Sequence, residues 1–284
     1  MKVLLIGGDS RQIYCAGRLA LLPDTEVSMI ALKEDDDRLP GQTLKPDIII
    51  LPYVSATNNE VNTPLSHLKI TLDDVESYIK SSCTVFCGKL PSERIKGFEA
   101  LGAKVSDWFG FEELTLKNAG LTAEGAAQLI TSRSDKAVSG STFLITGWGR
   151  VAKACAKLFK AMGGKVCIAA RREEARLEAK SYGYDTAGFI NLNAINNADI
   201  IVNTVPERVF GTDELKALRK GSWILELASK PYGLDFDMAK DLGVTAVLGA
   251  GLPGKYTPEK AGLFMAETII SELSMPHKGG KDNG

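Results

Sequence analysis

Residues 143–152 read Phe-Leu-Ile-Thr-Gly-Trp-Gly-Arg-Val-Ala, and this stretch decides the fold class. It opens with an apolar run typical of a buried strand, continues with the glycine pattern GxGxxA, and leads into apolar residues at helical spacing. A glycine pattern in this position, between a strand and a helix, predicts a dinucleotide-binding unit of the Rossmann type. We therefore expect a cofactor that carries a pyrophosphate to bind at this turn.

Each part of the turn has a chemical role in that interpretation. Gly147 permits the tight turn, Gly149 lets the backbone approach the pyrophosphate, and Ala152 allows close packing of the helix. The free N–H groups of the helix N-terminus then receive the phosphates. The alternative is a tight strand-to-helix turn that binds no ligand. We assign five residues of the turn to the cofactor: Gly147, Trp148, Gly149, Arg150 and Val151.

The end of the next expected strand indicates which cofactor is used. An NAD enzyme usually has Asp or Glu there to accept hydrogen bonds from the ribose hydroxyls, whereas this chain has Ala170-Arg171-Arg172. Two arginines beside a helix N-terminus are unfavourable unless an anion compensates them. The alternative is that both are solvated residues at the start of a helix. We expect Arg171 and Arg172 to bind a 2′-phosphate, and hence NADP as the cofactor.

Two later strand ends belong to the same expected edge of the sheet. The carboxyl ends of parallel strands form the ligand crevice in folds of this type. The residues after the strand at 200–203 would lie near the nicotinamide ribose, and those after the strand at 223–227 near the nicotinamide ring. This assigns to the cofactor Asn203, Thr204, Val205, Pro206, Leu227, Ala228 and Ser229.

Short apolar runs alternate with amphipathic stretches along the whole chain, which predicts parallel sheets with crossover helices. At 284 residues the chain is long enough for two domains. We predict two Rossmann-like, doubly wound parallel-sheet α/β domains with an interdomain cleft. Residues 1–118 would form a flavodoxin-like substrate domain and residues 119–284 an NADP-binding domain. A bridging helix is expected at 122–132, with Thr122 as its N-cap, and a last helix at 258–273 would return toward the first domain.

Composition excludes several classes of function. A formal net charge of −1 gives no basis for nucleic-acid binding. No apolar run is long enough to span a bilayer, and we interpret residues 1–7 as a core strand rather than a signal peptide, so we expect a cytoplasmic protein. The five cysteines have neither disulfide nor zinc-site spacing, and we expect them to be buried thiols. With only two histidines, we expect no metal site.

Two loops of the first predicted domain carry groups suited to an anionic substrate. They are residues 7–12, with Arg11, and residues 52–58, with Ser55 and Thr57. An arginine offers a bidentate fork for a carboxylate, and short hydroxyls donate single hydrogen bonds. The alternative is ordinary loop polarity, with Arg11 in an internal ion pair.

At this point the chain resembles the family of the dipicolinate synthase A subunit over nearly its whole length. The parallels are Gly7-Gly8-Asp9 with Arg11-Gln12, Leu51-Pro52 with Ser55-Ala56-Thr57, Thr122 with Glu124-Gly125, Gly147 with Gly149-Arg150, Leu227-Ala228-Ser229, and Gly251-Leu252-Pro253-Gly254 with Lys260-Ala261-Gly262. The chain departs from the family pattern at Tyr53, at Tyr232 and Leu234, and at Lys255-Tyr256. These departures concern the substrate site rather than the fold.

The resemblance implies oxidation of a dihydrodipicolinate to dipicolinate, pyridine-2,6-dicarboxylate, with NADP as acceptor in spore-forming cells. It also implies a second polypeptide, the dipicolinate synthase B subunit, as partner, and we expect a homo-oligomer. On this basis the substrate-binding candidates are Arg11, Ser55, Ala56, Thr57, Gly251, Leu252 and Pro253.

No residue is assigned as a catalytic acid or base. His67 is a candidate for such a role, because related 2-hydroxy-acid dehydrogenases use a histidine to move the hydroxyl proton. Two alternatives remain open. One is an alanine or 2-hydroxy-acid dehydrogenase of the same architecture, and the other is a non-catalytic NADPH-binding subunit.

Overall fold

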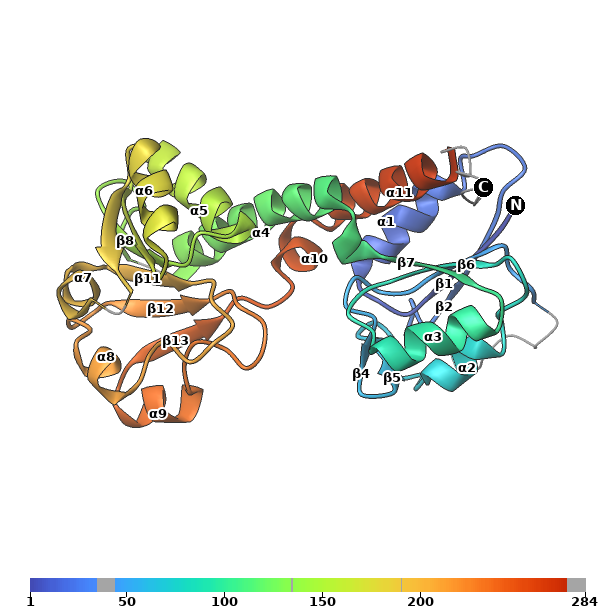
Figure 1. The fold of residues 1–284 in the computed structure, drawn as a ribbon, viewed down its shortest axis with the longest axis horizontal. Helices are drawn as coiled ribbons and strands as arrows, with labels where there is room; N and C mark the ends of the chain where they lie inside the picture. Colours follow the sequence, from blue (N-terminus) through green and yellow to red (C-terminus); the bar gives the residue numbers. More distant parts are fainter. Residues whose placement is uncertain (35–43, 134, 190, 275–284) are drawn as a thin grey trace, which may run out of the picture. The chain divides into compact units, whose positions relative to one another are not determined.

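The structure, a computed structural model, describes residues 1–34, 44–133, 135–189 and 191–274 (Figure 1). Two compact units divide the chain. The first comprises Met1–Lys117 together with the chain from Thr257 onward, and the second comprises Asn118–Tyr256. The sequence instead predicts a second domain over 119–284, with a last helix at 258–273 that returns toward the first domain. The last helix accounts for the difference, as its packing shows below.

The first unit contains a five-stranded parallel sheet in the order β2-β1-β3-β6-β7. Its strands are β1 (Lys2–Ile6), β2 (Glu26–Ile30), β3 (Ile48–Ile50), β6 (Thr84–Cys87) and β7 (Lys104–Asp107). Numbered along the chain, these strands follow the 2-1-3-4-5 order of flavodoxin-like folds. A short antiparallel pair, β4 (Ala56–Thr57) with β5 (Glu60–Val61), extends from the loop after β3.

Helices cover both faces of this sheet, as alternation along β1 requires. Leu4 and Ile6 pack with α2 (Leu72–Glu76) and α3 (Ser92–Ala100), whereas Val3 and Leu5 pack with α1 (Ser10–Leu19) and α11 (Pro258–Ser274). Figure 1 shows the same layering, with α2 and α3 below the strands and α1 and α11 above them. Successive side chains of β1 point to opposite faces, and both faces are buried. This explains why β1 is almost wholly apolar.

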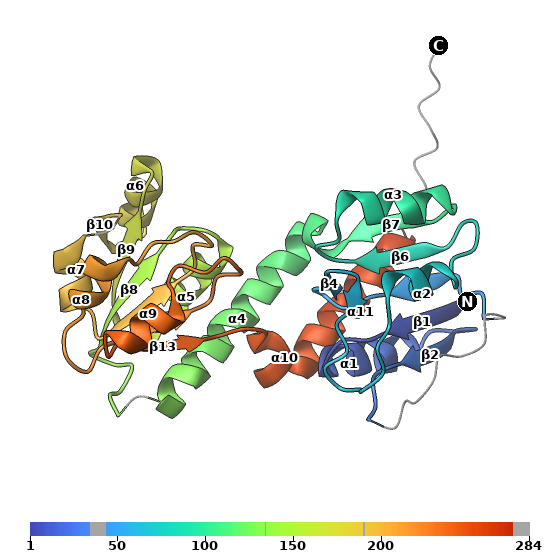
Figure 2. The ribbon, with the colours of Figure 1, turned by 90° about the horizontal axis from the view of Figure 1, so that it is seen from below.

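The last helix belongs to the first unit because it packs closely on α1. A Cβ added at Gly262 of α11 would lie 2.3 Å from the backbone oxygen of Arg11 and 3.0 Å from the backbone nitrogen of Cys15. Only glycine permits that approach, and Met265 and Ile269 of the same helix join the buried core beside Cys15 and Leu19. Figures 1 and 2 both show α11 alongside α1.

The second unit contains a six-stranded parallel sheet in the order β10-β9-β8-β11-β12-β13. This is the 3-2-1-4-5-6 order of dinucleotide-binding folds, so the predicted fold class is confirmed for both sheets. Its strands are β8 (Thr142–Thr146), β9 (Lys165–Ala170), β10 (Asp185–Gly188), β11 (Ile200–Asn203), β12 (Trp223–Glu226) and β13 (Thr245–Leu248). The helices are α5 (Arg150–Ala161), α6 (Glu173–Ser181), α7 (Leu192–Asn197), α8 (Thr212–Lys216), α9 (Phe236–Asp241) and α10 (Leu252–Tyr256).

One predicted helix is longer than expected. The segment 122–132 lies inside α4 (Glu112–Arg133), and the boundary between the two units falls within this helix. Thr122 is therefore not an N-cap, and the Thr122 hydroxyl donates to the carbonyl of Asn118 one turn earlier. The helix begins at Glu112. Glu112 and Glu113 both lie in its first turn, where the helix dipole stabilises negative charge.

Among the residues that the structure describes, no helix is long and apolar enough to cross a membrane.

Candidate cofactor site

The predicted glycine turn follows β8, the first strand of its unit, at the point where the strand order reverses. Gly147 has φ +91°, and an added Cβ would lie 2.8 Å from the Thr204 hydroxyl. Its N–H donates to the carbonyl of Ala169 at 2.8 Å, which fixes the turn against β9. Both the backbone conformation and the close neighbour require glycine at this position.

Helix α5 presents an open N-terminus directly after this turn. Gly149 is its N-cap in an extended conformation, no side chain caps the helix, and a Cβ at Gly149 would meet nothing within 4 Å. Backbone N–H groups of the first turn are thus available to an anion, and the helix dipole favours negative charge there. Ala152, one turn into the helix, is fully buried, as close packing on the sheet requires.

A pocket of about 570 Å³ lies over this turn. Its lining combines the glycine turn with the end of β9 and the start of α6, and six of the expected cofactor residues are among its walls. The lining residues are Gly147, Trp148, Gly149, Ala170, Arg171, Arg172, Ala175, Phe189 and Val205. Size, open helix N-terminus and cationic rim all suit a dinucleotide cofactor.

The two arginines differ in their surroundings. Arg172 is the N-cap of α6 and is exposed. The Arg171 guanidinium grips Glu207 in a bidentate pair, with distances of 2.8 and 3.0 Å to the two carboxylate oxygens, and lies 5.4 Å from the centre of the Phe189 ring. Sequence reasoning identified neither Glu207 nor Phe189, because both approach Arg171 from segments distant in the chain.

A buried polar network supports the neighbouring strand ends. The strand register places Thr146, Asn203 and Glu226 side by side on β8, β11 and β12. Asn203 accepts a hydrogen bond from the Thr146 hydroxyl and donates to both oxygens of Glu226 and to the Val205 carbonyl. The Asn203 side chain therefore lies within the fold rather than at the pocket.

Glu226 was missed by the sequence analysis, although it is the last residue of an apolar strand, which is a recognisable signal. Its carboxylate is fully buried and accepts from the backbone N–H groups of Ala228 and Gly233 at 2.8 and 2.9 Å. Burial raises the pKa of this carboxyl group, and the hydrogen bonds that it accepts oppose the rise. Glu226 thereby fixes the start of the loop that carries three further cofactor candidates: half-buried Leu227, buried Ala228 and exposed Ser229.

The remaining cofactor candidates on the β11 side line the turn rather than the core. Thr204 donates from its hydroxyl to the carbonyl of Thr146 at 2.7 Å, and Val205 forms part of the pocket wall. Pro206 is exposed. The candidate residues on β8, β9 and β11 thus meet at one edge of one sheet.

The substrate candidates of the first unit are largely tied to their own loops. Asp9, the N-cap of α1, holds Arg11 through two 2.8 Å hydrogen bonds, and the Arg11 side chain is only 12% exposed. Ser55 is fully buried, donates to the Pro52 carbonyl and accepts from the Gly88 N–H, each at 2.8 Å. Ala56 and Thr57 form β4, and the exposed Thr57 hydroxyl donates to Asn62 at 3.1 Å.

The other substrate candidates lie in the second unit. Gly251 has φ +65° and directly precedes α10, while Leu252 and Pro253 are buried. Leu252 packs in the same core as α4, where an added Cβ at Gly125 would meet the Leu252 Cβ at 2.7 Å. Leu252 is therefore part of the core, and the Gly251 turn is the accessible part of this segment.

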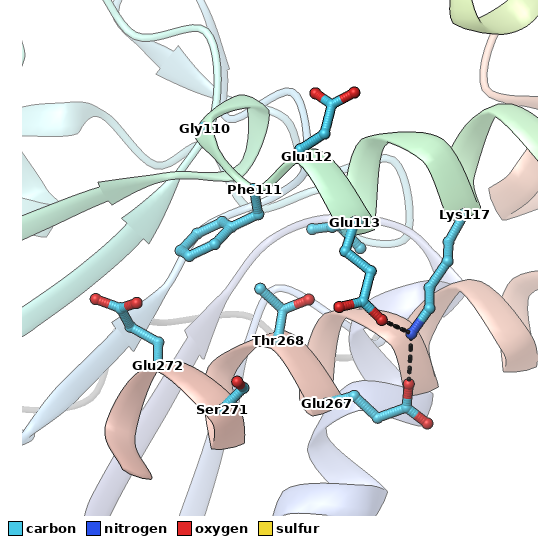
Figure 3. Close-up of a pocket in the computed structure, with 10 residues that line it drawn as sticks. Gly110, Phe111, Glu112, Glu113, Lys117, Glu267, Thr268, Ser271 and Glu272 are labelled. Atoms are coloured by element: carbon cyan, nitrogen blue, oxygen red, sulfur yellow. Dashed lines mark hydrogen bonds and ion pairs between the residues drawn. The ribbon is translucent and has the colours of Figure 1, made fainter. Parts of the chain in front are cut away.

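A second pocket, of about 460 Å³, lies between the start of α4 and the end of α11 in the first unit (Figure 3). Four carboxylates surround it, from Glu112, Glu113, Glu267 and Glu272. Lys117 pairs with Glu113 at 2.7 Å and with Glu267 at 3.3 Å, and these partners raise its pKa. The excess of negative charge makes this pocket unsuitable for a dicarboxylate.

The described residues offer little for acid–base or metal chemistry. The His67 side chain is 89% exposed and lies 3.7 Å from Glu34, while His277 lies outside the described residues. No group of three potential metal ligands is found in the described ranges. All five cysteines are free thiols; four are buried, as predicted, whereas Cys167 is half-buried. Burial raises the pKa of Cys15 and Cys155 to about 12.

Comparison with known proteins agrees with these features. Residues 2–109 match the model for the N-terminal domain of the dipicolinate synthase A subunit, and residues 120–235 match the NAD binding domain of D-isomer specific 2-hydroxyacid dehydrogenases. The second match assigns a nicotinamide-cofactor domain of dehydrogenase type to the unit that contains the glycine turn.

Several proteins that match nearly the whole chain are dipicolinate synthase A subunits. The dipicolinate synthase A subunit of Bacillus subtilis strain 168 is 29% identical over 96% of this chain and 95% of its own length. The crystal structure of the Bacillus halodurans A subunit superposes with a TM-score of 0.84 at 25% identity, covering 97% of this chain and 98% of that one. The crystal structure of the Bacillus subtilis protein gives 0.79 at 26% identity, covering 96% and 95%. The chain is therefore similar over nearly its whole length to dipicolinate synthase A subunits.

Proposed function

We propose that this protein oxidises a dihydrodipicolinate to dipicolinate with NADP as the acceptor, acting as the A subunit of a dipicolinate synthase. The observation that carries the proposal is the pocket in which an uncapped helix N-terminus faces Arg171 and Arg172, in a chain similar to dipicolinate synthase A subunits. We place the activity in the cytoplasm of spore-forming cells, as that similarity implies.

Atoms and electrons balance in this reaction without a further oxidant. The dihydro substrate would lose a hydride from a ring carbon to the nicotinamide and a proton to water, and its ring would become aromatic. Bound NADP supplies the hydride acceptor. Because aromatisation provides driving force, the protein has mainly to orient the two reactants, and positioning accounts for much of the barrier lowering in such a case. The scarcity of histidine near the described candidates is consistent with that division of work.

The chain's own residues take three parts in the proposal. The first turn of α5 binds the pyrophosphate, and Arg171 with Arg172 binds the 2′-phosphate. The network of Thr146, Asn203 and Glu226 holds the strand ends, including the Leu227–Ser229 loop. On this reading Asn203 positions the site through its neighbours.

For the substrate we propose the loops after β1 and β3. Asp9 engages Nε and one terminal nitrogen of Arg11, which leaves the second terminal nitrogen for a substrate carboxylate. Thr57 offers an exposed hydroxyl, and the buried hydroxyl of Ser55 holds the loop to Gly88. The turn at Gly251 provides the corresponding candidate in the second unit.

The test is cofactor reduction by the purified chain with a freshly generated dihydrodipicolinate, measured alone and with the B subunit. We expect NADPH and dipicolinate to form in equal amounts, with NADP used in preference to NAD. NADP binding without turnover, whether or not the B subunit is present, would instead support the non-catalytic NADPH-binding alternative. Turnover of alanine or a 2-hydroxy acid would support the other dehydrogenases. Size-exclusion chromatography with light scattering on the same samples tests the proposed homo-oligomer.

A further inference from the structure

We infer that Glu207 is a specificity-determining residue, which competes with the 2′-phosphate for Arg171 and so narrows the preference for NADP over NAD. The inference rests on the proposed function, because it assumes that Arg171 faces the 2′-phosphate. It adds a residue outside the glycine turn and outside the arginine pair.

The contact between the two side chains is the first step of the argument. Both terminal nitrogens of Arg171 are engaged, Nη1 with Oε2 of Glu207 at 2.8 Å and Nη2 with Oε1 at 3.0 Å. Two parallel N–H···O bonds are also the arrangement by which a guanidinium grips a phosphate. The Glu207 carboxylate thus occupies the fork that a 2′-phosphate would need.

The position of Glu207 is the second step. It follows Val205, a wall of the pocket, in the loop after β11, whereas Arg171 follows β9. The loop is anchored on both sides of Glu207. The Thr204 hydroxyl donates a hydrogen bond to the carbonyl of Thr146, and the N–H groups of Val209 and Phe210 donate to the carbonyl of Gly233. Glu207 therefore stays near Arg171 whichever cofactor binds.

Charge decides the direction of the effect. A cofactor without a 2′-phosphate leaves the pair of Arg171 and Glu207 intact. A 2′-phosphate must displace the carboxylate from the fork, and it then remains close to a like charge. The pair is exposed, with 58% and 59% of the two side chains accessible, so water can solvate the displaced carboxylate and the penalty is modest. We expect an effect of roughly two- to fivefold on NADP affinity.

The opposite reading is that Glu207 orients Arg171 for the phosphate, in which case its removal would weaken NADP binding. The Phe189 ring, 5.4 Å from the Arg171 guanidinium, already offers a second surface that orients the arginine. This makes Glu207 dispensable for orientation and leaves its charge as the main contribution.

The decisive variant is Glu207→Gln, which keeps the size of the side chain and removes its charge. The matched control is Asp213→Asn, which removes one negative charge from an exposed position in the first turn of α8. Dissociation constants for NADP and NAD are measured by calorimetry on the full-length protein, and quenching of tryptophan fluorescence gives a second readout, since Trp148 lines the pocket.

We expect Glu207→Gln to bind NADP about two- to fivefold more tightly, with NAD affinity changed by a smaller factor and the control unchanged. In the double variant with Arg171→Ala this gain should disappear, because the two side chains act on each other. An unchanged or weakened NADP affinity in Glu207→Gln overturns the inference. A gain equal for both cofactors, or equal in the control, also overturns it.

The measurements on the parent protein separate this inference from the proposed function. Suppose that the parent protein binds NADP and NAD equally well, with Arg171→Ala changing the affinity for neither. In that case the proposed NADP function fails, and the inference fails with it. If the parent prefers NADP through Arg171 but Glu207→Gln leaves the ratio unchanged, only the inference fails.

Discussion

The side-chain amide of Asn203 lies 2.8 and 2.9 Å from the two carboxylate oxygens of Glu226, and both residues are fully buried. Each oxygen of Glu226 also accepts a backbone N–H, from Ala228 on one side and from Gly233 on the other. The carboxylate is thus surrounded by donors. Through these hydrogen bonds it links β11 and β12 to the loop that follows β12.

Replacing that carboxylate tests the network. In Glu226→Gln an amide NH₂ must face a backbone N–H, so one buried donor loses its partner, and we expect the free energy of unfolding to fall by about 1–3 kcal/mol. NADP affinity should fall as well, because the Leu227–Ser229 loop loses its anchor. Urea unfolding and cofactor titration measure both effects. Glu174→Gln, exposed on α6, is the control. Wild-type stability in Glu226→Gln would refute the structural role.

The arginine pair provides the test of cofactor choice. Replacing both Arg171 and Arg172 with Ala removes two charge-assisted contacts to a 2′-phosphate, and NADP affinity should drop about ten- to a hundredfold. NAD affinity should change much less. Lys157→Ala, an exposed cation on α5, controls for net charge. Calorimetric titration with both cofactors decides the matter, and an unaltered ratio of the two affinities would remove the pair from the phosphate site.

Arg11 has two possible roles that one variant separates. If its second terminal nitrogen binds a substrate carboxylate, Arg11→Ala should weaken dipicolinate binding roughly ten- to a hundredfold and leave NADP binding intact. If the arginine only braces the Asp9 cap of α1, the melting temperature falls and dipicolinate affinity does not. We expect the first result. A stable variant that binds dipicolinate as tightly as the parent would exclude Arg11 from the site.

The pH dependence of stability should contain a component from Asp199, which precedes β11. Burial opposes ionisation of this carboxyl group, but hydrogen bonds from Lys136 and the Thr142 N–H, with the charge of Arg219, lower its pKa overall. A lowered pKa means that the native state favours the ionised form. The stabilisation is therefore present above the unfolded pKa of about 3.9 and is lost as pH falls through the lower folded value.

Asp199→Asn should accordingly be less stable than the parent near neutral pH, by about 1 kcal/mol, because its partners Lys136 and Arg219 are both partly exposed. The difference should shrink in acid below the unfolded pKa. Urea unfolding at neutral and acidic pH gives the comparison, with Asp213→Asn alongside. A difference that is constant across this range would contradict the assigned ionisation.

The local sequence pattern is enough to predict much of the secondary structure of the cofactor unit. The run 143–152 contains its own strand, turn and helix start, and the chemistry of Gly147 and Gly149 follows from backbone geometry over a few residues. The strands expected at 200–203 and 223–227 and the helix expected at 258–273 agree with β11, β12 and α11 to within one residue, because hydrophobic periodicity is a local signal. Arg171 and Arg172 could be located because they follow the next strand at a fixed place in the fold.

The tertiary structure decided which segments that are far apart in the chain come into contact. The register of β8, β11 and β12 brings Thr146, Asn203 and Glu226 into one buried row, so Asn203 supports the fold from inside. The fold also brings Glu207 to Arg171, and packing of Gly262 on α1 assigns the last helix to the first unit. Such pairings depend on strand order and helix packing, which single-residue patterns do not encode. The sequence by itself thus determined the type of site and its local elements, and only the tertiary structure decided which distant side chains complete them.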